Sequence, residues 1–268
     1  MRESRGCGRG GSVRRRRRRR SEGQLAKRDI TIETGDGKAK AGLFAPDGSR
    51  GSLPGVVLYI DAFGPRPALD GMAGRLAAAG YVVLVPDLFY RHGAYGPYDT
   101  HTAFSNEKTR AEIMGMLNTT THAMTERDSG AFIETLRGEG AGRIGTVGYC
   151  MGGGRAITAA AAYPDRVAAA ASIHGGNLAS DADDSPHRRA RTIAGRVYVA
   201  NAGEDRSFPP EQSARLAEAL RVAGVDHAIE NYVGMAHGWA VPDHSVFNPV
   251  GAERHWKRLL EFFAETLH

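Results

Sequence analysis

A cysteine lies at the centre of a glycine-rich turn in the middle of this 268-residue chain. In the run Gly148-Tyr149-Cys150-Met151-Gly152-Gly153, glycines stand two positions before and two positions after the cysteine. This spacing is typical of a nucleophile elbow, a strained strand-to-helix turn that leaves no room for larger neighbours. The following helix would place Cys150 near its positive N-terminal end, where a thiolate is favoured. The run is equally compatible with a glycine-rich turn around a buried, inert cysteine.

Two further residues have the types and positions of a catalytic acid and base. Asp205 follows the β-rich run 197–201, and His237 follows the run 228–233. In α/β-hydrolases the nucleophile, the acid and the histidine occur along the chain in this order. Taken alone, each residue is also compatible with an ordinary turn or loop position, and Glu204 is a near rival to Asp205. The order of all three nevertheless predicts nucleophilic catalysis by a Cys-His-acid triad.

The elements that must position these residues alternate between strand and helix. Short β-rich runs bounded by turn residues predict strands, at 29–33, 38–44, 55–60, 81–85, 143–147, 167–173, 197–201 and 228–233. Helical patterns occur near 67–79, near 119–137, after the elbow and near 251–266. The first two strands should be antiparallel, while the alternation that follows predicts an α/β fold, a mostly parallel sheet with helices on both faces. Sites in such sheets lie at the carboxyl ends of the strands.

Several motifs resemble the dienelactone hydrolase family (carboxymethylenebutenolidase-like), a branch of the α/β-hydrolase superfamily. The resemblance covers about residues 28–268, and its motifs are Gly148–Gly153, Asp61-Ala62-Phe63-Gly64, Pro86-Asp87-Leu88-Phe89-Tyr90-Arg91, Asp205 with Phe208-Pro209-Pro210, and His237-Gly238-Trp239. It implies the α/β-hydrolase fold and a Cys-His-Asp triad that needs no cofactor and no metal. By this resemblance Cys150 is the nucleophile, His237 the base, and Asp205 rather than Glu204 the acid.

The resemblance also implies roles for residues around the triad. The backbone N–H groups of Ala62 and Met151 would form the oxyanion hole. The substrate pocket would be lined by side chains on the neighbouring loops, namely Asp61, Phe63, Tyr90, Arg91 and Trp239. The three aromatic residues among them would shape an apolar acyl pocket, although each is equally compatible with packing in a lid or in the core.

Two positions depart from the family pattern. The family enzyme that opens dienelactone has a glutamate that contacts the resting cysteine and an arginine. Here that position is Asp61, one methylene shorter, and Arg91 matches the arginine, which implies an Asp61–Arg91 pair near Cys150. The same enzyme has an arginine four residues after the catalytic histidine, where this chain has Val241. Losing that contact to a substrate carboxylate forfeits roughly 1.5–3 kcal/mol, which disfavours a small anionic lactone as substrate.

These features predict a cysteine-dependent hydrolase of small-molecule carboxylic esters or lactones, as a monomer or dimer. One alternative is a thioesterase or general esterase with a different acyl preference. Another is a non-catalytic α/β-hydrolase scaffold that binds a ligand or, through its N-terminal segment, nucleic acid. The presence of nucleophile, acid and base together favours the enzyme.

Charge is unevenly distributed along the chain. Residues 1–22 carry a net charge of +8, including the unbroken run Arg14–Arg20, so the rest of the chain carries −3 although the total is +5. Such a block is expected to be a disordered tail over residues 1–24, either anion-binding or the product of a start site assigned too early. Nucleic acid is therefore expected as a partner only through this tail. No apolar core follows the arginines, so they do not resemble a secretory signal.

The remaining composition limits the class of protein. No run of about 18 apolar residues occurs, so no membrane span is predicted. The two cysteines cannot form a disulfide framework, which favours a cytoplasmic setting. One hydrolase domain is expected over 25–268. The acidic run 181–184 lacks the ligand spacing of an EF-hand loop. His174, at the end of the predicted strand 167–173, is expected to be a core histidine, and the alternative is that it lines the pocket.

Overall fold

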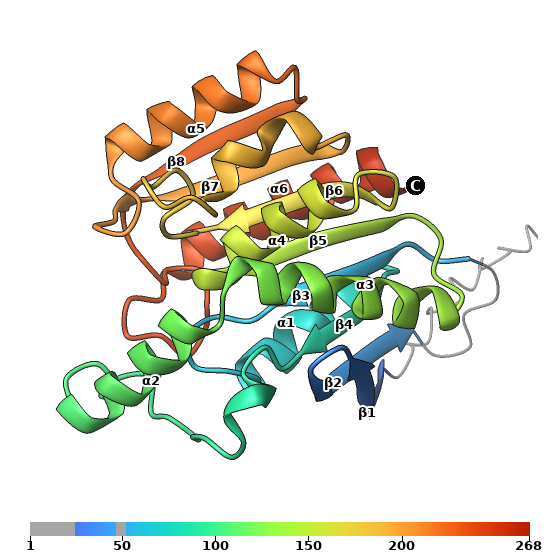
Figure 1. Cartoon of the computed structure of the whole chain (residues 1–268), viewed down its shortest axis with the longest axis horizontal. Helices are drawn as coiled ribbons and strands as arrows, with labels where there is room; N and C mark the ends of the chain where they lie inside the picture. Colours follow the sequence, from blue (N-terminus) through green and yellow to red (C-terminus); the bar gives the residue numbers. More distant parts are fainter. Residues whose placement is uncertain (1–24, 47–51) are drawn as a thin grey trace, which may run out of the picture.

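The computed structural model describes residues 25–46 and 52–268, and the strands of this part form one eight-stranded sheet (Figure 1). The strands are β1 (Leu25–Thr34), β2 (Gly37–Pro46), β3 (Gly55–Tyr59), β4 (Val82–Pro86), β5 (Ile144–Tyr149), β6 (Val167–Ile173), β7 (Arg196–Glu204) and β8 (His227–Ala236). Their order is β1-β2-β4-β3-β5-β6-β7-β8. The pairs β1–β2 and β2–β4 are antiparallel, and all the others are parallel. The predicted mostly parallel sheet is confirmed, and the predicted tail over 1–24 lies outside the described residues.

Helices cover both faces of the sheet. They are α1 (Pro67–Ala78), α2 (Glu107–Thr119), α3 (His122–Gly138), α4 (Met151–Ala162), α5 (Pro210–Val222), α6 (Pro249–Leu267) and the 3-10 helices η1 (Tyr90–His92) and η2 (Pro186–Thr192). Figure 1 shows α3 and α4 in front of the sheet and α6 behind it. Helix α1 packs beside α6, where the Arg75 guanidinium lies 4.7 Å from the ring centre of Trp256. None of the described helices is long and apolar enough to span a membrane.

The central strands are buried on both faces. Every residue of β3, β4 and β5 is buried, as expected where helices cover both sides of a parallel sheet. Because these strands run in one direction, their carboxyl ends meet at a single edge. The loops at that edge carry the residues singled out by the sequence, Asp61 after β3, Cys150 after β5, Asp205 after β7 and His237 after β8.

Helices α2 and α5 have no counterpart among the predicted elements. Helix α2 buries only Ile113 and Met116, and α5 buries only Leu216 and Leu220. A helix that is exposed over most of its surface lacks the broad apolar stripe by which an amphipathic helix is recognised in a sequence.

Candidate active site

Cys150 lies at the sharp turn between β5 and α4, in a backbone conformation that non-glycine residues rarely adopt. Its φ is 55° and its ψ is −123°. A Cβ atom at Gly148 would lie 1.8 Å from the carbonyl oxygen of Gly152, and a Cβ atom at Gly152 would lie 2.4 Å from the carbonyl oxygen of Tyr59. Both flanking glycines are therefore sterically required, and the turn has the geometry of a nucleophile elbow.

His237 and Asp205 come from different loops and meet in a hydrogen bond of 2.7 Å between Nδ1 and Oδ2. The Asp205 side chain is only 2% exposed, and its Oδ1 accepts hydrogen bonds from the amide and the hydroxyl of Ser207, at 2.8 and 2.6 Å. Burial opposes ionisation, but the hydrogen bonds with His237 and Ser207 hold the pKa of Asp205 below its ordinary value. Glu204 is exposed. Ser207 was not predicted from the sequence.

The His237 ring also interacts with Cys150. Burial alone would lower the pKa of His237, but the proximity of Cys150 and the hydrogen bond to the Asp205 carboxylate raise this pKa to about 10. These surroundings favour the protonated form of the His237 ring. A cysteine, a histidine and an aspartate thus lie at one edge of the sheet, and these residue types can supply a nucleophile, a base and an orienting acid.

Two backbone N–H groups beside the elbow are available to an oxyanion. Met151 is the first residue of α4, so its N–H has no acceptor within the helix. The N–H of Ala62 donates to none of the described residues. Gly152 brings the start of α4 against the end of β3, since its Cβ position lies 2.6 Å from the carbonyl oxygen of Ile60. The two donors thus belong to segments that touch.

The Asp61–Arg91 pair implied by the sequence is wrong. Asp61 is fully buried and accepts hydrogen bonds of 2.7 and 2.8 Å from Arg66, five residues along the same loop. The Asp61 carboxylate also lies 3.1 Å from Nε2 of His244. Arg66 in turn binds Asp243 at 2.6 and 2.9 Å. This cluster joins the loop of Ala62 to the loop of His237. This cluster was not predicted from the sequence, because Asp243 and His244 lie in a segment without a strand or helix pattern.

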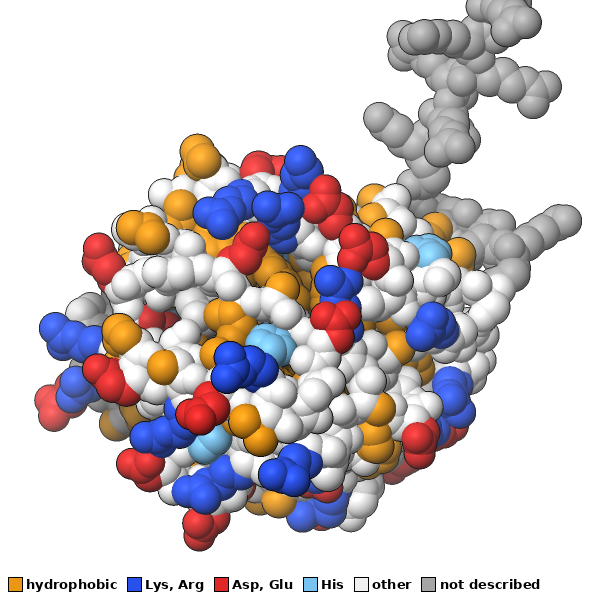
Figure 2. Space-filling view, turned by 90° about the horizontal axis from the view of Figure 1, so that it is seen from above, with side chains coloured by type: hydrophobic (Ala, Val, Ile, Leu, Met, Phe, Trp, Pro, Cys, Tyr) orange, Lys and Arg blue, Asp and Glu red, His pale blue; other side chains and the backbone are white. Residues whose placement is uncertain are grey.

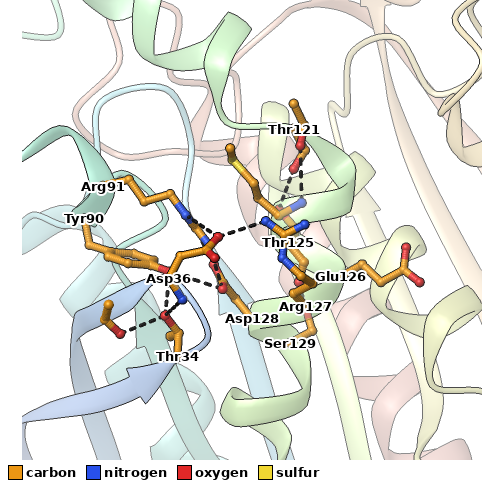
Figure 3. A network of polar contacts seen from close by, with 12 residues as sticks. Thr34, Asp36, Tyr90, Arg91, Thr121, Thr125, Glu126, Arg127, Asp128 and Ser129 are labelled. Carbon is orange, nitrogen blue, oxygen red and sulfur yellow. Dashed lines mark hydrogen bonds and ion pairs between the residues drawn. The ribbon is translucent and has the colours of Figure 1, made fainter.

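Arg91 and Tyr90 lie in a polar network of their own (Figure 3), and their assignment to the substrate pocket stays a prediction. The Arg91 guanidinium donates to both carboxylate oxygens of Asp128 in α3, each at 2.8 Å, and to Asp36 in the β1–β2 turn. The Tyr90 hydroxyl lies 2.6 Å from the hydroxyl of Thr34. The carboxylates of Asp128 in α3 and of Asp36 in the first hairpin therefore neutralise Arg91. Among the described residues, Arg91 has no contact with Asp61.

The two remaining aromatic candidates differ in their surroundings. Trp239 is fully buried and stacks on Tyr232 with ring centres 4.3 Å apart, which favours the core-packing alternative, and its assignment to the pocket stays a prediction. Phe63 packs edge-on against Phe104, with ring centres 5.4 Å apart, and Phe104 is 45% exposed. Phe63 and Phe104 thus form an apolar edge next to Ala62, and Phe104 was not found from the sequence.

Replacing Asp61 by asparagine is expected to lower the free energy of unfolding by about 3 kcal/mol at pH 7, because Arg66 loses the charge of a buried partner. Burial opposes the charged form of Asp61, but hydrogen bonds from His244 and Arg66 lower its pKa to about 2. The contribution of a carboxyl with a lowered pKa is complete above about pH 4 and is lost as the pH falls through about 2. Urea denaturation of wild type and variant should show a smaller difference at pH 3 than at pH 7.

Asp243→Asn provides the matched control for this prediction, because it removes the other carboxylate bound to Arg66. Its side chain is 34% exposed, whereas that of Asp61 is fully buried. A loss of only about 1 kcal/mol is expected, since solvent screens the pair. Equal losses in the two variants would show that burial of Asp61 does not matter.

Comparison with known proteins gives consistent matches. The model of the Dienelactone hydrolase family matches residues 40–267. A carboxymethylenebutenolidase of Rhodococcus opacus is 27% identical over 226 residues, covering 81% of this chain and 83% of that protein. The structure of a dienelactone hydrolase-like promiscuous phosphotriesterase from metagenomic libraries superposes with a TM-score of 0.76 at 21% identity, covering 92% of this chain and 100% of that one. A dienelactone hydrolase from Anabaena variabilis gives a TM-score of 0.65 at 16% identity, with 91% and 100% covered. Both structures share the fold of this chain.

Proposed function

Since this chain belongs to the dienelactone hydrolase family, whose members are hydrolases, we propose that it hydrolyses carboxylic esters or lactones by acyl transfer through Cys150, His237 and Asp205. One observation carries the proposal. The 2.7 Å hydrogen bond between His237 and Asp205 joins two loops at the strand edge where Cys150 lies in a strained elbow. A scaffold that only binds a ligand has no need of that arrangement.

The proposed reaction has two steps. His237 holds the proton of the Cys150 thiol while the thiolate attacks the carbonyl carbon, and Asp205 orients the imidazolium. The carbonyl oxygen takes the electron pair, and the N–H groups of Ala62 and Met151 stabilise its charge. The C–O bond then breaks, and the leaving alkoxide takes the proton from His237. In the second step His237 deprotonates a water molecule, which attacks the thioester, releases the acid and restores Cys150.

The chemistry of the nucleophile limits the substrate class. A thiolate leaves a tetrahedral intermediate more readily than an alkoxide does, so addition to an unactivated carbonyl tends to reverse. Activated esters, enol-lactones and thioesters therefore suit this site better than amides. A thioesterase or general esterase with another acyl preference is the second candidate, and it uses the same residues.

The proposed substrate is neutral at its acyl group. Val241 is fully buried where the dienelactone-opening enzyme has an arginine. Arg66, on the same loop as Ala62, already binds the two carboxylates of Asp61 and Asp243. Neither position offers a free guanidinium to a substrate carboxylate, and the nearby edge formed by Phe63 and Phe104 is apolar.

The test compares p-nitrophenyl butyrate with mono-p-nitrophenyl succinate, which share a leaving group and differ in one carboxylate, and adds a dienelactone. The neutral ester is expected to have a kcat/KM at least about tenfold higher, because a missing charge-assisted contact amounts to roughly 1.5–3 kcal/mol. Faster hydrolysis of the succinate or the dienelactone would show that another cation binds the carboxylate. No turnover of any ester, together with an unreactive Cys150, would favour the non-catalytic scaffold.

Binding of nucleic acid stays a prediction that concerns the arginine-rich segment 1–24, which lies outside the described residues. Figure 2 shows acidic and basic side chains interspersed over one face of the described part. That face therefore offers no uniformly basic surface to a polyanion.

A further inference from the structure

His174 follows β6, and its ring lies within hydrogen-bonding distance of the backbone of Cys150. It is fully buried, and its φ of 38° is in the left-handed region that is uncommon outside glycine, although asparagine, aspartate and histidine adopt it more often than other residues. Its own N–H donates to the carbonyl oxygen of Ala200 in β7 at 2.8 Å. The backbone of His174 is therefore held by the neighbouring strand, and its side chain is directed towards the site instead of continuing along the sheet.

The His174 ring accepts a hydrogen bond from the nucleophile's own backbone. The N–H of Cys150 lies 3.2 Å from Nδ1 of His174 and 3.1 Å from the carbonyl oxygen of Ile173. Among the described residues this is the one hydrogen bond that the His174 side chain makes, since its Nε2 is buried without a partner there. The N–H of Cys150 is thus already hydrogen-bonded to His174 and Ile173. At the elbow this leaves the N–H of Met151 as the donor for an oxyanion.

The charge state of His174 agrees with its role as an acceptor. Burial lowers the pKa of His174 well below its ordinary value. The charges of His237, His244 and His255 lower this pKa further, and the charge of Asp61 raises it. A neutral ring with its proton on Nε2 keeps Nδ1 free to accept, whereas a protonated ring would lose the elbow amide.

His174 also contacts the catalytic base. Its ring packs edge-on against that of His237, with centres 5.2 Å apart, while Tyr149 and Trp239 enclose it at 5.9 and 6.0 Å. One buried ring therefore touches both the residue that carries the sulfur and the residue that takes its proton.

We propose that His174 is a positioning residue, which holds the strained elbow through the Cys150 amide so that the sulfur stays aligned with His237. The inference rests on the proposed function of Cys150 as nucleophile. It assigns to a buried histidine a role that core packing alone would not require, because packing needs the shape of the ring and positioning needs an acceptor at Nδ1.

Two substitutions distinguish the effect of the hydrogen-bond acceptor at Nδ1 from the effect of the size and shape of the His174 ring. Asparagine tolerates a positive φ and carries an acceptor oxygen close to the position of Nδ1, whereas leucine fills similar space without an acceptor. In His174→Leu, kcat for p-nitrophenyl butyrate is expected to fall about 30-fold with KM changed less than about threefold, because a misplaced nucleophile slows chemistry more than binding. In His174→Asn, kcat should stay within about fivefold of wild type.

Thermal melting checks that each variant is folded at the assay temperature. If the leucine variant does not fold, His174→Gly replaces it, since glycine accepts the backbone conformation and also lacks the acceptor. A folded leucine or glycine variant with unchanged kcat would overturn the proposal. Equal losses of kcat in the asparagine and leucine variants would also overturn it, because the acceptor would then make no difference.

A second readout keeps the inference separate from the proposed function. The thiolate is the form of cysteine that reacts with iodoacetamide, so the alkylation rate of Cys150 at pH 6 reports its alignment with His237. That rate is expected to fall about tenfold in the leucine variant and to be largely retained in the asparagine variant. If the wild type hydrolyses no ester, the proposed function fails, and these alkylation rates still decide whether His174 positions the thiol.

Discussion

Replacing Cys150 by alanine is expected to lower kcat for p-nitrophenyl acetate by about 10⁴-fold or more, the scale seen when a nucleophile is removed from a triad. Without the sulfur no acyl-enzyme forms, and the amides of Ala62 and Met151 retain only residual stabilisation of an attack by water. The measurement is the rate of p-nitrophenolate release by wild type and variant at equal concentration. Pre-steady-state experiments with substrate in excess should show a burst of p-nitrophenolate in the wild type and none in the variant.

Cys150→Ser is the matched control for the removal of the sulfur. It keeps the size of the side chain and the φ of 55° at the elbow, but a serine hydroxyl is a far weaker acid and relies on His237 as a general base. Activity between those of the wild type and Cys150→Ala is expected. Removal of a nucleophile lowers activity on the 10⁴-fold scale. If the alanine variant keeps more than about a tenth of wild-type activity, Cys150 is not the nucleophile.

Replacing Asp205 by asparagine is expected to lower kcat by about 10³-fold to 10⁴-fold, because an amide N–H opposite His237 imposes the wrong tautomer on the ring. Asp205 accepts two hydrogen bonds from Ser207, and this holds its second oxygen towards His237 at 2.7 Å. The asparagine variant also loses the negative charge that stabilises the imidazolium. The pH dependence of kcat and the thermal melting of the variant distinguish this loss from unfolding.

Glu204→Gln tests the rival acid in the same loop. Glu204 is exposed, whereas the carboxylate of Asp205 is 2% exposed and bound to the ring. Replacement of Glu204 by glutamine should change kcat less than about twofold, as is usual for an exposed side chain. A large loss in Glu204→Gln with little change in Asp205→Asn would transfer the role of the acid to Glu204.

The cluster of buried Asp61, Arg66 and the partly exposed Asp243 lies beside the candidate site. It connects the loop of Ala62 to the loop that carries His237. Removing one member of a buried ion pair leaves an uncompensated charge, which is costly. For this reason the Asp61 variant is expected to lose stability, and its kcat should fall together with that stability.

Much of the chain's architecture was predictable because the signals are local. Apolar runs with strand propensity located the core strands, and the spacing of small residues located the elbow at Cys150. The positions of Asp205 and His237 after successive parallel strands then followed, since the carboxyl ends of such strands share one edge. Helices α2 and α5, each of which buries only two residues, were missed.

By itself the sequence determined the order of the elements and the residue types at the ends of the strands. Only the tertiary structure decided which charged and polar side chains meet. Arg91 matched a family position, yet it binds Asp36 and Asp128, while Asp61 is neutralised by Arg66 from its own loop. The physical reason is that a buried charge must find a partner within hydrogen-bonding distance, and that partner depends on how distant loops pack together.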